Sequence, residues 1–400
     1  MINLGLNSTV NAQRVHISFF GLRNAGKSSL VNAVTNQEIA VVSDIKGTTT
    51  DPVKKSMELL PLGPVLITDT PGFDDEGELG EKRVVKTMQV LEKTDIAVLV
   101  SDATREILKM EQELIETFEK KNIPYVVVFN KCDLGKAHNK TDANVIYTSA
   151  TEKINIDNLK NLLASYSKPQ SDKKLLGDLL NPEDVVVLIT PIDESAPKGR
   201  MILPQVQTIR DILDSDAICV VTKENTYEKT LEILGDRVKL AICDSQVFAM
   251  INKLTPPHIL LTSFSILMAR FKGYLKEAYN SAKVLDDIKE GDKILISEGC
   301  SHHRQCGDIG TVKLPKLIKK YTGINPVFES TQGTEFPTEL KEYKLVIHCG
   351  GCMLNEREVQ SRMNSSLASG TPFCNYGVAI AYMNGIIKRS TDIFSELKGE

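Results

Sequence analysis

The stretch GLRNAGKSS, residues 21–29, decides the fold of the N-terminal part of this chain. An apolar run, Val15–Phe20, leads directly into it, and a helical pattern follows. Glycines near both ends let the backbone wrap closely around a phosphate, and the start of the following helix adds positive potential. A strand, a glycine-rich turn and a helix in this order predict a phosphate-binding loop in a parallel α/β domain.

The side chains of this loop have separable expected roles. Lys27 should reach the β and γ phosphates of a nucleotide, and Ser28 should bind Mg²⁺. The other nucleotide contacts are expected from Gly21, Asn24, Ala25, Gly26 and Ser29. The alternative is a chance glycine turn before a helix, and each further nucleotide-binding motif found below disfavours it.

A second motif, Asp69-Thr-Pro-Gly72, ends the apolar strand Val65–Thr68. Asp69 can orient the metal ion through a water molecule, and the Gly72 N–H can sense a γ phosphate. Taken alone, this tetrapeptide could equally be an ordinary turn. With Lys27 and the first switch described below, these two residues form the predicted catalytic set.

Two more motifs predict which base is bound. Asn130-Lys131-Cys-Asp133 follows the strand Tyr125–Phe129, and Asp133 can accept hydrogen bonds from the ring N–H and the exocyclic amine of guanine. Adenine offers no such pair of donors. Ser149 and Ala150 follow a short strand and can add a backbone contact to the guanine oxygen. Four motifs in this order predict a domain that binds GTP and GDP rather than ATP.

Residues 14–165 resemble the branch of small GTPases that includes the tRNA-modifying enzyme MnmE and the ribosome-assembly protein Era. The resemblance implies a first switch at residues 47–51, with Thr49 as the Mg²⁺ ligand and Thr48 as the alternative. It also implies that Asn24 binds K⁺, which could act in place of an arginine finger. Phe73 stands where better-known GTPases have a water-orienting glutamine, so slow intrinsic hydrolysis is expected.

Composition limits the other functions of the chain. Its 48 basic and 52 acidic residues give a net charge of −4, which favours no general nucleic-acid binding. No segment has the roughly 18 consecutive apolar residues that a membrane span needs, and no secretory leader is recognisable, so a cytoplasmic protein is expected. Eight cysteines are too few for a disulfide scaffold, and in a reducing compartment clustered thiols more often bind metal.

Length and strand–helix alternation predict an α/β chain of three domains. The predicted limits are 1–170 for the nucleotide domain, 175–268 for a small parallel-sheet domain, and 269–400 for a C-terminal α/β domain. Apolar runs such as Val185–Ile189 and Lys293–Ser297 supply the strands of the second and third domains.

The third domain carries two metal-ligand patterns, each after a predicted strand. Cys300-Ser-His302 follows Lys293–Ser297, and His348-Cys349-Gly-Gly-Cys352 follows Lys344–Ile347. If the two strands are neighbours in a parallel sheet, both patterns reach one crevice. Spacing alone fits either tetrahedral zinc or an iron–sulfur cluster, and unrelated core cysteines are the remaining alternative. Further along, Cys306 is a reserve ligand and His303 could compete with His302.

A GTPase followed by this cysteine and histidine pattern resembles the HydF family, the GTPase scaffolds of [FeFe]-hydrogenase maturation, over nearly the whole chain. The resemblance implies a middle dimerisation domain and a C-terminal [4Fe-4S] cluster held by Cys300, Cys349 and Cys352. His302 and His348 match motif histidines of less certain role. Implied partners are a second copy of the chain, two radical-SAM maturation enzymes and the apo-hydrogenase, which receives a two-iron precursor.

Two rival functions remain. One is a GTPase of RNA or ribosome assembly with a structural zinc module, which the acidic balance disfavours. The other is an electron-transfer protein, for which a second cluster motif would be expected.

Overall fold

The computed structural model describes residues 11–37, 52–72, 78–135, 143–166, 173–192, 201–300 and 308–397. The chain forms two compact units, Met1–Asp172 and Lys173–Glu400. Each unit is an α/β structure with largely parallel sheets, which confirms the predicted fold class. None of the helices in the described ranges is long and apolar enough to cross a lipid bilayer.

The first unit is built on a six-stranded sheet in the order β2-β3-β1-β4-β5-β6. Its strands are β1 (Val15–Phe20), β2 (Val53–Leu59), β3 (Gly63–Asp69), β4 (Ile96–Asp102), β5 (Tyr125–Asn130) and β6 (Val145–Tyr147). Only β2 runs antiparallel to its neighbour, while the other pairs are parallel. The carboxyl ends of β1, β3, β4, β5 and β6 therefore meet at one edge, where all four predicted nucleotide motifs begin.

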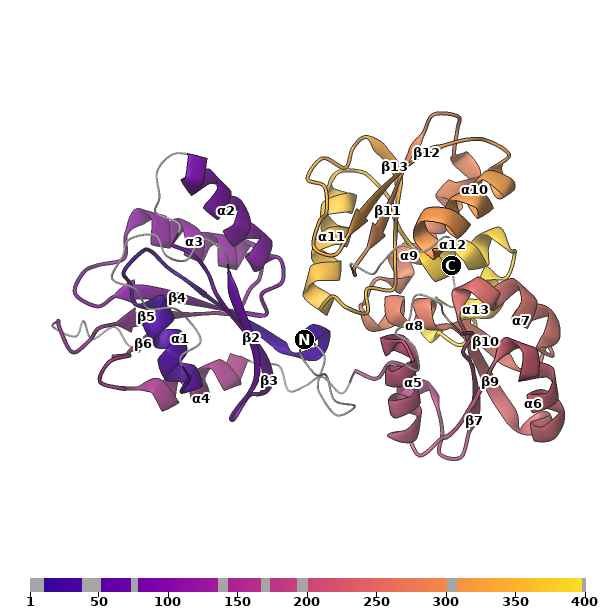
Figure 1. The fold of residues 1–400 in the computed structure, drawn as a ribbon, viewed down its shortest axis with the longest axis horizontal. Coiled ribbons are helices and arrows are strands. Elements are labelled where there is room, and N and C mark those ends of the chain that lie inside the picture. The colour runs from indigo at the N-terminus through magenta and orange to yellow at the C-terminus, as the bar shows by residue number, and fades with distance from the viewer. Residues whose placement is uncertain are drawn as a thin grey trace. The chain divides into compact units, whose positions relative to one another are not determined.

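Two helical layers cover this sheet (Figure 1). The helices are α1 (Lys27–Thr35), α2 (Glu78–Leu91), α3 (Lys109–Lys120) and α4 (Ile156–Tyr166). On one face, Leu30 of α1 and Leu159 of α4 pack on Ile17, and on the other face Leu91 of α2 and Phe118 of α3 belong to a second core. Because strands buried on both faces need mostly apolar residues, β1 and β4 are predominantly apolar, and the polar residues His16, Ser18 and Ser101 within them are buried.

The second unit contains two four-stranded parallel sheets with the orders β8-β7-β9-β10 and β12-β11-β13-β14. The strands of the first sheet are β7 (Val185–Ile189), β8 (Ile218–Thr222), β9 (Val238–Cys243) and β10 (Leu260–Ser263). Those of the second are β11 (Lys293–Glu298), β12 (Val327–Gln332), β13 (Tyr343–His348) and β14 (Phe373–Asn375). The same strand order thus occurs twice in succession.

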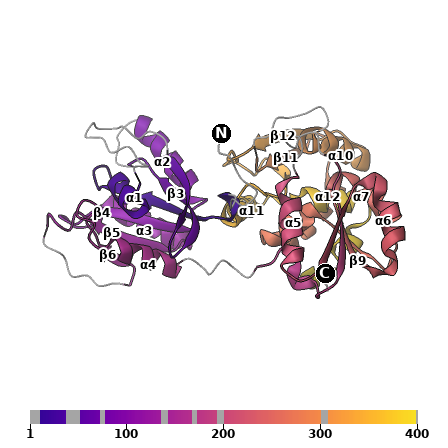
Figure 2. The same ribbon diagram turned by 60° about the horizontal axis from the view of Figure 1, so that its bottom comes forward.

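Helices cover both sheets, and one apolar core continues from one sheet to the other. Figure 2 shows α5 on one side of the first sheet and α6 and α7 on the other. The helices of this unit are α5 (Leu203–Leu213), α6 (Tyr227–Leu234), α7 (Phe248–Leu254), α8 (Phe264–Phe271), α9 (Leu275–Ser281), α10 (Leu314–Thr322), α11 (Glu356–Ala368), α12 (Tyr376–Met383) and α13 (Ile387–Thr391). Because α8 packs against α9 and α12, the two sheets form one compact body, and the predicted limit at 268/269 falls inside it.

Candidate functional site

The phosphate loop between β1 and α1 has glycine at two crowded positions. A Cβ atom on Gly21 would lie 2.2 Å from the Val100 carbonyl oxygen, and one on Gly26 would lie 2.3 Å from the Asn130 Nδ2 atom. Gly26 also has a φ angle of 86°, which disfavours any other residue. Asn24 is exposed at the outside of the loop with a φ angle of 58°, a conformation that asparagine tolerates.

Lys27 and Asp69 provide the charges of this loop. The Lys27 Nζ atom donates to the carbonyl oxygens of Gly21 and Leu22, at 2.9 and 2.7 Å. The Ser28 hydroxyl donates to Asp69 Oδ2 at 2.7 Å, and Asp69 is 1% exposed. Burial raises the pKa of Asp69, against the opposing effects of Ser28 and Lys27. A serine hydroxyl beside a buried carboxylate suits Mg²⁺ held by the serine and by a water molecule on the carboxylate.

One oxygen of this carboxylate supports the same interpretation. Asp69 Oδ1 is buried, and no hydrogen-bond partner for it is found within the described residues. Buried carboxylate oxygens are normally paired, so an unpaired one marks a place for a metal-bound water. Gly72, the third predicted residue of this motif, lies at the end of the described stretch 52–72.

Asn130 joins the phosphate loop to the base-binding loop. Its Nδ2 atom donates to the carbonyl oxygen of Ala25 at 3.2 Å and approaches that of Gly26 at 3.5 Å. Its Oδ1 atom accepts from the Ala150 N–H at 3.0 Å and from the Thr148 hydroxyl at 3.4 Å. The structure therefore brings three of the four predicted motifs together through one buried side chain.

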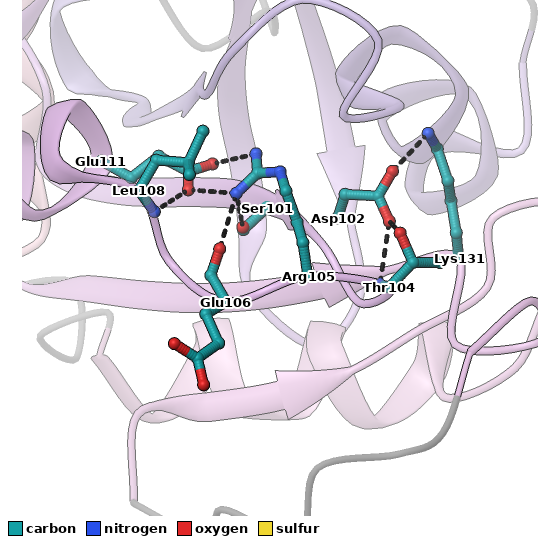
Figure 3. A network of polar contacts seen from close by, with 8 residues as sticks. All are labelled: Ser101, Asp102, Thr104, Arg105, Glu106, Leu108, Glu111 and Lys131. Atoms are coloured by element: carbon teal, nitrogen blue, oxygen red, sulfur yellow. Dashed lines mark hydrogen bonds and ion pairs between the residues drawn. The ribbon is translucent and has the colours of Figure 1, made fainter.

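Lys131 is held by a carboxylate from the neighbouring strand (Figure 3). Its Nζ atom lies 2.7 Å from Asp102 Oδ2, while the other oxygen of Asp102 accepts from the N–H and hydroxyl of Thr104. Burial alone would raise the pKa of Asp102, but the hydrogen bonds from Lys131 and Thr104 lower it to about 2. Asp133, the predicted guanine reader, is exposed two residues further along.

A second ion pair in Figure 3 was not foreseen from the sequence. Arg105 donates to both oxygens of Glu111 at 2.7 and 2.9 Å, and Glu111 also accepts from the Leu108 N–H. Glu111 is fully buried, so this pair fixes the start of α3 to the loop that follows Asp102. Glu111 is the third residue of α3, a position where a glutamate often accepts from the N–H of the residue just before the helix. That spacing was the sequence signal available for this pair.

The predicted cluster cysteines lie at the carboxyl ends of two adjacent strands. Strands β11 and β13 pair in parallel, with Ser297 opposite His348. Cys300 follows the end of β11 by two residues, and Cys349 follows β13 directly. The Gly299 N–H donates to Cys349 Sγ at 3.1 Å, so the two cysteine stretches are in contact.

The chemistry of these thiols fits a bound cation or cluster. The Sγ atom of Cys349 accepts from the N–H groups of both Gly299 and Gly351, and such bonds stabilise thiolate sulfur. Burial raises the pKa of the Cys352 thiol to about 12, and Cys349 acts in the same direction. A thiolate in such surroundings needs a positive partner, which iron or zinc would supply.

His348 is at this site but is already engaged. It is fully buried, its Nδ1 atom lies 2.7 Å from the Cys349 carbonyl oxygen, and its Nε2 atom lies 3.3 Å from Arg362 Nη1. Burial first, and then the Arg362 charge, lower its pKa to about 3. A neutral ring that donates from Nδ1 and accepts at Nε2 has no nitrogen left for a metal ion in this arrangement.

Several predicted residues lie outside the described ranges. These are the switch residues Thr48 and Thr49, Phe73, and, from the metal patterns, His302, His303 and Cys306. Among the residues that the structure does describe, no group of three metal-binding side chains is assembled. The three-thiolate site therefore stays a prediction.

Comparison with protein families resolves the architecture. Residues 16–131 match a model of the 50S ribosome-binding GTPase family, residues 175–273 match the hydrogen maturase F dimerization domain, and residues 276–393 match the hydrogen maturase F tetramerization domain. The last two models together cover more than half of the chain. The chain belongs to the HydF family. It thus combines a domain of a GTPase family with the dimerization and tetramerization domains of hydrogen maturase F.

Curated relatives of this HydF chain match its GTPase part. The tRNA modification GTPase MnmE of Thermoanaerobacter sp. is 34% identical over 179 residues, 43% of this chain and 37% of that protein. GTPase Der of Kosmotoga olearia is 33% identical over 162 residues, 36% of each protein. The chain thus spans little more than a third of the length of these relatives. Era of Aquifex aeolicus, a solved structure, aligns with 18% identity and a TM-score of 0.35 over 56% of this chain and 98% of that one, which is too distant to carry an argument.

Proposed function

We propose that this chain is a cytoplasmic GTPase scaffold that holds a [4Fe-4S] cluster through Cys300, Cys349 and Cys352. In this proposal it assembles or delivers the two-iron subcluster precursor to apo [FeFe]-hydrogenase, together with two radical-SAM maturation enzymes. The observation that carries the proposal is the placement of the two cysteine stretches at adjoining ends of β11 and β13, with the Gly299 N–H bonded to Cys349 Sγ.

Three protein thiolates suit a carrier better than four. A cluster held by three cysteines keeps one iron open, and that position can bind or bridge a precursor and release it. The nucleotide would act as a timer, since a γ phosphate orders the switch loops of GTPases and hydrolysis releases them. GTP hydrolysis and cluster binding then reside in different compact units of the chain.

Metal analysis tests this proposal. The protein would be purified without oxygen, supplied with iron and sulfide, and analysed for iron, sulfide and zinc, with EPR of the reduced sample. About four irons and four sulfides per chain, with the EPR signal of a reduced [4Fe-4S] cluster, is the expected result. Zinc bound without iron would instead support the RNA-assembly GTPase with a structural zinc module.

Potassium is expected to accelerate GTP hydrolysis. Asn24 is exposed at the rim of the phosphate loop, where its side-chain oxygen could bind a cation beside the phosphates. Such a cation would stabilise charge in the transition state, so the turnover in K⁺ should exceed that in Na⁺ by roughly tenfold or more. Asn24→Gly retains the φ angle of 58° and removes the oxygen, so it should abolish the preference. Equal rates of the unsubstituted protein in both salts would remove this role from Asn24.

Strand β8 is the part of the dimerization domain best suited to contact a second copy. Four of the five residues in its sequence, ICVVT, are apolar, yet no residue of β8 is buried, whereas every residue of β7, VVVLI, is. As the edge strand of its sheet it has unpaired backbone groups, and Ile218 and Val221 are 49% and 45% exposed. We infer that the β8 strands of two copies pair across a two-fold axis.

A charged residue on the β8 edge should halve the number of copies in the assembly. Val221→Lys places an ammonium group on the apolar edge of each of the two strands, so light scattering after gel filtration should give half the mass of the unsubstituted protein. Ile233→Lys is the matched control, because Ile233 is 67% exposed on α6 and is not part of the β8 strand. An unchanged mass for Val221→Lys would exclude β8 as the contact.

A further inference from the structure

The loop Cys349–Leu354 packs against α8, a helix of the dimerization domain. A Cβ atom on Gly350 would lie 3.2 Å from Met268 Cβ and 3.8 Å from Ser265 Cα, so the two backbones are in close contact. Because the loop belongs to the tetramerization domain, residues of both domains surround the cysteines.

Lys272 is a buried cation at the end of this helix. It is 2% exposed, and its Nζ atom donates to the Leu354 carbonyl oxygen at 2.7 Å. The Leu354 side chain packs against Gly299, where a Cβ atom would lie 2.8 Å from Leu354 Cγ. Lys272 thus fixes Leu354, and Leu354 in turn connects the turn at Cys352 with Gly299, the residue before Cys300. Leu354 follows Cys352 by two residues, so this buried ammonium group lies beside the cysteine loop.

Tyr274 holds the other end of the same loop. Its hydroxyl donates to the Cys349 carbonyl oxygen at 2.9 Å and accepts from Asn375 Nδ2 at 2.9 Å. The Lys272 carbonyl oxygen is itself bound by Gln360 Nε2 at 2.6 Å. The segment 272–274, at the junction of the two family domains, is therefore anchored at both ends while it positions the cysteine loop.

We propose that Lys272 and Tyr274 are positioning residues of the cluster site, and that Lys272 also supplies the buried positive charge that offsets the cysteine thiolates. This inference rests on the proposed cluster. A cluster with three thiolates carries net negative charge, and burying an anion without a counter-charge is unfavourable. Lys272 would stabilise the reduced, more negative state most strongly, whereas Tyr274 would act through the backbone alone.

The test uses the full chain with a reconstituted cluster. Lys272→Met removes the charge and the hydrogen bond, Lys272→Gln retains a donor for Leu354, and Tyr274→Phe removes the hydroxyl. Two readouts are measured: the midpoint potential by EPR, and the rate at which a chelator removes iron. Losing a residue that supports metal ligands typically costs about 10–100-fold in metal retention, so Lys272→Met should release iron at least about tenfold faster.

The two substitutions of Lys272 should change the midpoint potential in the same way but the iron-release rate to different extents. Both should shift the potential to a more negative value, because both lack the cation, whereas Gln should release iron more slowly than Met. Tyr274→Phe should release iron faster with an unchanged potential. Lys276→Met, an exposed residue on α9, is the matched control and should alter neither readout.

The outcomes separate this inference from the proposed function. If the unsubstituted protein binds no cluster, the proposed function fails. If it binds a cluster and Lys272→Met has the same potential and the same iron-release rate, the proposed function stands and the role of Lys272 is wrong. Circular dichroism of each variant shows whether the fold is retained. If Lys272→Met does not fold, the midpoint potential of Lys272→Gln is compared with that of the unsubstituted protein, and an unchanged potential would show that the charge of Lys272 has no such role.

Discussion

Cys349→Ser is expected to abolish cluster binding while GTP hydrolysis continues at nearly its original rate. The thiol stands directly after β13, and its sulfur accepts hydrogen bonds from two backbone N–H groups, which a serine oxygen cannot match as a ligand for iron. With two thiolates left from three, bound iron per chain should fall by more than about tenfold. GTP turnover should stay within roughly twofold, because the phosphate loop lies in the other compact unit.

The control for this experiment is another cysteine of the same unit. Cys219 is half-buried on β8, far along the chain from the cluster pattern, and Cys219→Ser should keep both iron and GTP turnover. Retention of a full complement of iron by Cys349→Ser would show that Cys349 is not a ligand. Loss of both cluster and GTP turnover would show that the two units do not work separately.

Asp133→Asn is expected to weaken GTP binding by roughly 100-fold or more. The carboxylate would accept two N–H groups of guanine, and hydrogen bonds to charged groups contribute about 1.5–3 kcal/mol each. An amide offers one acceptor and turns an N–H₂ group toward the guanine amine, which adds a repulsive contact. Titration with a fluorescent GTP analogue measures the affinity directly.

Xanthosine triphosphate provides the matching control for this variant. Xanthine has a carbonyl oxygen in place of the guanine amine, and that oxygen can accept from the new amide. Asp133→Asn should therefore bind this nucleotide more tightly than the unsubstituted protein does. Weak binding of both nucleotides would point to a misfolded loop, and unchanged GTP affinity would exclude Asp133 as the base reader.

The strands that the sequence predicts best are those buried on both faces. Val15–Phe20 and Val185–Ile189 match β1 and β7 residue for residue, because β7 is wholly apolar and β1 is interrupted only by His16 and Ser18. Strands β12 and β14, at the two edges of the last sheet, have no such signal. VFESTQ has no continuous apolar run, and FCN is too short for any period to appear.

The same distinction applies to the candidate sites. The phosphate-loop motif is local in sequence, so residue type and spacing are enough to recognise it, whereas the three-cysteine site joins stretches far apart in the chain and stays a prediction. The side chains that hold these motifs in place come from far along the chain. Lys272 and Tyr274 bond to residues 82 and 75 positions away, and Asn130 reaches back 105 positions to Ala25. Only tertiary packing brings such pairs together, and the local pattern of apolar and polar residues does not predict which distant residues will meet.

The two-sided bonding of Asn130 has a consequence for ligand selectivity. Because one amide is fastened both to the phosphate loop and to the loop beneath the base, ordering either loop also orders part of the other. A ligand that carries both a guanine and a polyphosphate orders both loops in one binding event, so the entropy lost by the loops counts once against its affinity. Guanosine alone or inorganic pyrophosphate alone must each overcome most of the same loss, so neither should compete effectively with the intact nucleotide at cellular concentrations.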